Sequence, residues 1–80
     1  MVTQISTLSR VTAAADIEDA KVRARNHPLQ RSIVPLRGCS MLSVYFCGQG
    51  VFLYGHNKAD GELVYTTDED KAIALVEAER

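Results

Sequence analysis

The strongest constraint on the fold is a β-hairpin signal in the middle of the chain. Two runs rich in β-branched, aromatic and aliphatic residues, Met41 to Cys47 and Gly50 to Gly55, are separated only by Gly48 and Gln49. A type II′ turn requires glycine at its first central position, and Gly48 supplies it. We therefore predict two antiparallel strands joined by a two-residue turn at Gly48-Gln49.

That turn would set the pairing of the two strands. Cys47 would lie opposite Gly50, and Val44 opposite Leu53. Because successive side chains of a strand point to opposite faces, this register predicts one aliphatic and one aromatic face. The aliphatic face would hold Leu42, Val44, Phe46, Val51 and Leu53. The aromatic face would hold Tyr45, Phe52 and Tyr54, to which Tyr65 of a following strand could add.

The residues before the hairpin carry two successive signals. A strand from Thr3 to Ala13 is favoured by the residues at alternate positions, which are Thr3, Ile5, Thr7, Ser9, Val11 and Ala13. The spacing of Ile5, Leu8, Val11 and Ala15 also fits a helix. Asp16 to Arg25 predicts a helix, with Asp16 as the N-cap and basic residues towards its end. This helix should stop at Asn26-His27-Pro28, because the residue before a proline is biased away from helical geometry.

The remaining elements complete a small sheet and add a second helix. Ser32 to Leu36 predicts an edge strand, because Pro35 cannot donate a ladder hydrogen bond. Glu62 to Thr66 predicts a third strand of the meander, and Thr67 is the expected N-cap of the last helix, with Asp70 as its capping-box partner. The predicted fold class is α+β, in the order β-α-β-β-β-β-α, with two helices packed on an antiparallel sheet.

Length and composition indicate one soluble domain. A chain of 80 residues, 46% hydrophobic and 24% charged, can fold around one small core, so we predict a single α+β domain over residues 1–80. No apolar run approaches the ~18 residues that span a bilayer, and the start lacks signal-peptide features, so we expect no membrane and a cytoplasmic location. Cys39 and Cys47 are too few for a disulfide scaffold and are expected to be reduced and mostly buried.

Motifs for catalysis or metal binding are not recognisable in this sequence. His27, Cys39, Cys47 and His56 lack the short paired spacings of zinc modules. Cys39, Ser40 and Cys47 are not surrounded by a nucleophile motif. We therefore predict no enzymatic activity, no cofactor and no metal site, and a function in binding.

Charge is distributed unevenly along the chain, although its net value is only −1. Residues 20–59 contain six basic and no acidic residues, whereas acids dominate from Asp60 onwards. A basic site that could contact phosphates would consist of Lys21, Arg23, Arg25, Arg31 and Arg37. An acidic site that could imitate a phosphate backbone and bind a protein would consist of Asp68, Glu69, Asp70, Glu77 and Glu79.

The aromatic face of the hairpin is a third candidate site. If both helices cover the aliphatic face, Tyr45, Phe52 and Tyr54 stay exposed, and exposed aromatic patches are common at interfaces. If one helix covers each face, the same rings belong to the core. The choice between these two arrangements decides what this group of residues does.

Residues 47–54 also resemble, in part, the first RNA-binding signature of the RRM family. Both glycines, Gly48 and Gly50, and the final aromatic, Tyr54, match that signature. The signature's other aromatic and basic positions are occupied here by Gln49, Val51 and Cys47. The resemblance implies RNA binding by the hairpin, together with the basic site.

Small size, the helix from Asp16 to Arg25 and the acidic segment from Thr67 to Glu79 resemble small proteins of phages and mobile elements, anti-CRISPR inhibitors among them. That resemblance implies a non-enzymatic inhibitor that binds another protein and blocks a nucleic-acid-binding complex by steric or electrostatic obstruction. Two alternatives stay open. One is a small nucleic-acid-binding module, and the other is a homodimer with a structural or regulatory role that pairs its aromatic faces.

Overall fold

A computed structural model describes residues 2–79 of the chain, and the side chains of residues 12–79. The class is α+β, as predicted: two helices and a four-stranded antiparallel sheet in the order α-β-β-β-β-α. The helices are α1 (Val2–Asn26) and α2 (Glu69–Glu79). The strands are β1 (Ser32–Pro35), β2 (Met41–Gly48), β3 (Val51–Asn57) and β4 (Leu63–Thr66).

Helix α1 is longer than the sequence predicted. The strand expected from Thr3 to Ala13 is wrong, because these residues belong to α1, and Asp16 lies inside the helix instead of capping it. No glycine or proline interrupts residues 2–26, so a helix that packs on the sheet can extend through the weakly alternating segment. The predicted end is confirmed at Asn26, two residues before Pro28.

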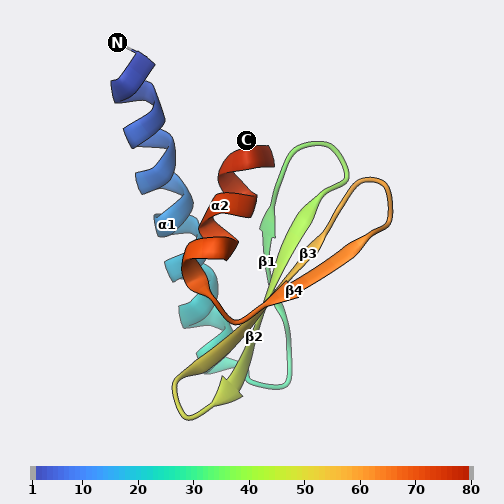
Figure 1. The fold of residues 1–80 in the computed structure, drawn as a ribbon. Helices are drawn as coiled ribbons and strands as arrows, with labels where there is room; N and C mark the ends of the chain where they lie inside the picture. The colour runs from blue at the N-terminus through green and yellow to red at the C-terminus, as the bar shows by residue number, and fades with distance from the viewer. Residues whose placement is uncertain (1, 80) are drawn as a thin grey trace.

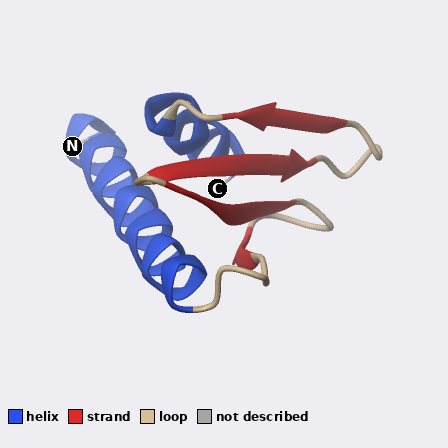
Figure 2. Ribbon diagram, turned by 90° about the horizontal axis from the view of Figure 1, so that it is seen from below, coloured by secondary structure: helices blue, strands red, loops and turns tan. Residues whose placement is uncertain are grey.

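Both helices pack on the same face of the sheet, as Figures 1 and 2 show. The strands follow one another in space as they do in sequence, which places β1 and β4 at opposite edges. The predicted edge strand at Pro35 is therefore confirmed. The core lies between the helices and this face, and its buried hydrophobic residues are Ala13, Ile17, Ala20, Ala24, Val34, Leu42, Val44, Phe52, Tyr54, Ala72, Ile73 and Val76.

The hairpin is present, but its predicted turn and register are wrong. Gln49 and Gly50 both have positive φ, at 54° and 75°, which is the pattern of a type I′ turn. Cys47 is left without a partner at a bulge between Phe46 and Gly48. Beyond the bulge the strands are therefore shifted by one residue from the predicted register.

This shift changes which side chains of β3 meet those of β2. Phe46 lies opposite Phe52, and Val44 lies opposite Tyr54. Because a shift of one residue moves every side chain of a strand to the other face, Phe52 and Tyr54 point towards the helices. Leu53, expected on the aliphatic face, points the other way and is only half-buried.

The start of α2 lies one residue later than expected. Asp68, not Thr67, is the N-cap: its Oδ1 accepts hydrogen bonds from the backbone N–H groups of Asp70 at 2.9 Å and of Lys71 at 3.4 Å. Thr66 Oγ1 accepts a hydrogen bond from the N–H of Asp68 at 3.0 Å and supports the turn before the helix. A carboxylate at this position also suits the positive end of the helix dipole.

Candidate binding surfaces

The face of the sheet opposite the helices, here called the open face, is the first candidate surface. It lies on the side of the sheet away from α1 and α2 (Figure 1). Its alternating positions from all four strands carry apolar and aromatic side chains, several of them exposed, among them Tyr65 at 57%. The side chains concerned are Ile33, Met41, Tyr45, Leu53, Leu63 and Tyr65.

A hollow of about 200 Å³ lies on the open face. Gly55 forms part of its lining, and the ring of Tyr65 lies so close that a Cβ on Gly55 would be 2.9 Å from Tyr65 Cε1. The ring of Tyr45 approaches the same point from β2. Arg31 and Asn57 supply polar groups to the lining. The hollow therefore combines two tyrosine rings with one guanidinium group, and no acidic residue lines it.

Only one of the three predicted aromatic site residues belongs to the open face. Tyr45 lies there, whereas Phe52 and Tyr54 are in the core, at 6% and 2% exposure. Burial raises the pKa of the Tyr54 hydroxyl. Tyr54 is also the matching aromatic of the RRM signature, and a buried ring cannot stack on a base. The register shift thus removes Phe52 and Tyr54 from the candidate aromatic surface. It adds Leu53 to the open face, although the predicted register placed Leu53 on the aliphatic face.

Most of the predicted acidic residues interact with other groups of the fold. Asp68 caps α2, and Glu69 Oε1 accepts a hydrogen bond from Lys21 Nζ at 2.8 Å. Glu79 Oε1 lies 3.9 Å from Nε2 of the buried His56. Glu77 is half-buried, and Asp70 is exposed. Asp68, Glu69 and Glu79 therefore have contacts within the fold, and Glu77 also has an interaction partner.

The predicted basic residues are dispersed over the molecule. Lys21 Nζ and the guanidinium of Arg25 lie 5.2 and 5.5 Å from the centroid of the Phe52 ring, at one end of the core. The hydrogen bond to Glu69 raises the pKa of Lys21, against the opposing effect of burial. Arg37 is exposed in the loop between β1 and β2. Only Arg31 lies beside the tyrosines of the open face.

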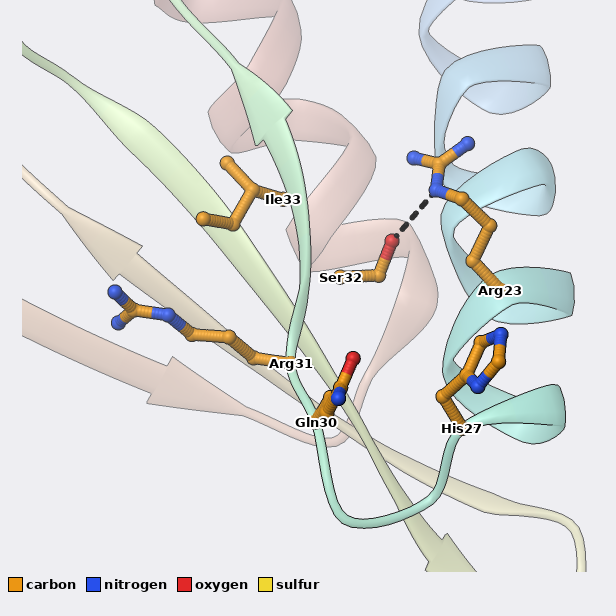
Figure 3. Close-up of a pocket in the computed structure, with 6 residues that line it drawn as sticks. All are labelled: Arg23, His27, Gln30, Arg31, Ser32 and Ile33. Carbon is orange, nitrogen blue, oxygen red and sulfur yellow. Dashed lines mark hydrogen bonds between the residues drawn. The ribbon is translucent and has the colours of Figure 1, made fainter.

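A second hollow, of about 290 Å³, lies between the end of α1 and the start of β1 (Figure 3). Arg23, His27 and Arg31 are among its lining residues, and Arg23 Nε donates a hydrogen bond to Ser32 Oγ at 2.9 Å. In Figure 3 the side chain of Arg31 points away from Arg23 and His27, towards the neighbouring strands. Arg31 lines both hollows and so connects this basic region with the open face.

Among the described residues, no three His, Cys, Asp or Glu side chains come together as a metal site would require. Cys39 and Cys47 are free and exposed, not mostly buried. Cys39 precedes β2 and Cys47 lies near the far end of that strand, so the extended strand between them excludes a bridge. No helix in the described part of the chain is long and apolar enough to cross a membrane.

Comparison with protein-family models, with curated proteins and with solved structures finds no match to this chain.

Proposed function

We propose that this chain functions by binding a protein through the open face of its sheet. The observation that carries the proposal is the group of apolar and aromatic side chains on a face against which neither α1 nor α2 packs. Soluble monomers rarely expose a contiguous apolar patch unless it is used for an interaction. Tyr45 and Tyr65 are suited to this role because tyrosine supplies a large contact area with little side-chain entropy to lose.

The rim of the open face also has the chemistry of a protein interface. Arg31 supplies a guanidinium group beside the two tyrosines, and arginine and tyrosine are both enriched in interfaces. Arg31 makes no ion pair with another described side chain, so its charge is available to a carboxylate of a bound protein. The hypothesis that the bound protein belongs to a nucleic-acid-binding complex, which this chain would inhibit, stays a prediction.

Nucleic-acid binding is a second candidate function, favoured by the basic hollow of Arg23, His27 and Arg31. These residues could contact phosphates, and the adjoining Tyr45 could stack on a base. Lys21 and Arg25 do not line this hollow, because their cationic groups lie over the Phe52 ring, and this makes nucleic-acid binding the weaker candidate.

Capture from cells that contain both a tagged and an untagged copy of the chain tests the proposal. After nuclease treatment, the tagged chain should retain protein, either its own untagged copy or another, and Tyr65→Lys should abolish that retention. The matched control is Val22→Lys, which adds the same charge at an exposed apolar residue of α1 and should leave retention unchanged. Equal retention by Tyr65→Lys would contradict the proposal. Retention that disappears with nuclease would favour the second candidate.

A further inference from the structure

The two edges of the sheet differ in charge. The segment that surrounds the β1 edge, residues 23–37, contains four arginines and no acid. The segment on either side of β4, residues 58–70, contains five acids and one lysine. Arg23 and Arg25 belong to α1, and Glu69 and Asp70 to α2, so these four lie on the helix side, where Asp16 and Asp19 of α1 also lie beside β1. Next to the open face, the outer strand β1 is flanked by Arg31 and Arg37, and the outer strand β4 is preceded by Asp60 and Glu62, which gives this face a basic and an acidic edge.

The positions of the charges along these edges can be read from the strand pairing. Strands β1 and β4 run in opposite directions, since each neighbouring pair in the sheet is antiparallel. Arg31, before β1, is thus at the same end of the sheet as Asp68, which follows β4. Arg37, after β1, is at the same end as Asp60, which precedes β4. Each end of the sheet has a base at one edge and an acid at the other.

We infer that the open face binds a second copy of this chain. This inference rests on the proposed function and names its partner. A two-fold axis that lies between the two faces, parallel to the strands, would place the basic edge of each copy over the acidic edge of the other. Arg31 would then meet the second copy's Asp68, and Arg37 would meet the second copy's Asp60. Such an interface is closed, because both copies use the same surface.

The centre of the open face fits the same arrangement. The axis would place Tyr65 opposite the second copy's Ile33, and Tyr45 opposite the second copy's Leu53, because these residues occupy the same rows of the sheet. All four side chains are apolar or aromatic and at least partly exposed. Sheets pack face to face in this way at about −30°, with the side chains of both inner faces interdigitated.

Affinity should be modest and should depend on salt. The open face has only four strands, and the two outer strands have four residues each, so we expect a small interface and a dissociation constant in the micromolar range. The net charge of −1 adds almost no repulsion between copies. Four edge ion pairs would be screened by salt, so dimerisation should weaken several-fold from about 0.05 to about 0.5 M NaCl.

Sedimentation velocity of the purified chain at increasing concentration, up to about 1 mM, is the first measurement. The wild type should pass from monomer to dimer, and Tyr65→Lys should weaken this association by about tenfold or more, because it places a charge at the centre of the interface. Lys71→Asp, an exposed charge reversal on α2, is the control and should dimerise as the wild type does. Circular dichroism of each variant verifies that it folds.

Charge reversal provides the sharper test. Arg37→Asp alone would place two acids against each other in both edge contacts, and Asp60→Lys alone would place two bases there, so each variant should dimerise several-fold less well than the wild type. An equimolar mixture of the two variants should form a heterodimer of about wild-type affinity, because both of its edge contacts become attractive again. No other occupant of the open face predicts this mutual rescue.

A wild type that stays monomeric throughout this concentration range would overturn the inference, as would dimers in which the charge variants show neither loss nor rescue. A monomer that nevertheless captures a different protein through Tyr65 would overturn only the inference and leave the proposed function in place. If the chain neither dimerises nor captures a protein through the open face, both the inference and the proposed function are wrong.

Discussion

The two faces of the sheet differ less in composition than in what covers them. The helix face has Leu42, Val44 and Tyr54 under α1 and α2, while the open face has Tyr45, Leu53 and Tyr65 with no helix above them. Leucine, tyrosine and other large apolar residues occur on both. The placement of the two helices therefore decides which of these side chains are buried. The other face, which has similar side chains and no helix on it, is available for binding.

Truncation of one leucine on each face should give the largest difference in stability between variants of the two faces. Leu42 is fully buried at 0% exposure, so Leu42→Ala should lower the free energy of unfolding by about 3 kcal/mol through lost contacts and a cavity. Leu53 is half-buried on the open face, so Leu53→Ala should cost about 1 kcal/mol or less. Urea unfolding of both variants at a concentration where the chain is monomeric measures these values.

This pair of variants also tests the register of the hairpin. In the register predicted from the sequence, Leu53 would share the covered face with Leu42, and both truncations would be costly. Equal losses of stability would thus contradict the pairing of Val44 with Tyr54.

His56 is a buried residue of the helix face whose hydrogen-bonding groups are poorly satisfied, and replacing it should have an intermediate effect. The ring is 1% exposed, and neither of its nitrogens has a hydrogen-bond partner among the described residues. A buried polar group without a partner costs stability, so His56→Leu should raise the free energy of unfolding by about 1 kcal/mol. Thermal or urea unfolding at neutral pH measures the change.

Glu79 makes this prediction falsifiable. Its Oε1 lies 3.9 Å from His56 Nε2, and a charged pair at that distance would be lost in His56→Leu. A destabilised variant would show that the pair stabilises the fold. In that case Glu79→Gln should cause a similar loss, whereas an unpartnered neutral ring predicts almost no effect of Glu79→Gln.

Much of the fold could be predicted because its local signals are strong. The end of α1 near Pro28 and the edge strand at Pro35 each follow from a proline, which has a definite backbone effect. The α+β class follows from the combined signals of the hairpin and the two helices. The start of α1 could not be predicted in this way, because residues 2–15 contain several possible N-cap residues and no glycine or proline that marks a boundary. Ala13 is buried in the core, so packing on the sheet supports the helix at this point, and that contact is not a local signal.

The sequence could predict a sheet face with aromatic side chains, but it could not predict which residues form that face. The loop can form a type II′ turn with Gly48 and Gln49 as its central residues, or a type I′ turn with Gln49 and Gly50 as its central residues and a bulge beside it. Each pair contains a glycine, so the sequence is compatible with both turns. The difference of one residue decides whether Phe52 and Tyr54 or Leu53 face the helices. The cross-strand fit of the two strands selects the second turn, and that information is not local.

Unfolding at alkaline pH should report on Tyr54, the buried tyrosine of the helix face, and is the smallest of the three expected effects. Burial raises the pKa of Tyr54 from its ordinary 10.0, and the hydrogen bond to Glu69 raises that of Lys21 from 10.5. Both groups hold their protons more tightly in the folded chain, so their stabilisation is complete below pH 10 and is lost as the pH rises through the folded-state pKa values. The urea midpoint should therefore fall above pH 10. This decrease of the urea midpoint should be smaller in Tyr54→Phe. The variant Tyr65→Phe, on the open face, should show the same decrease as the wild type. If the midpoint decreases equally with pH in both variants, Tyr54 is not the group responsible.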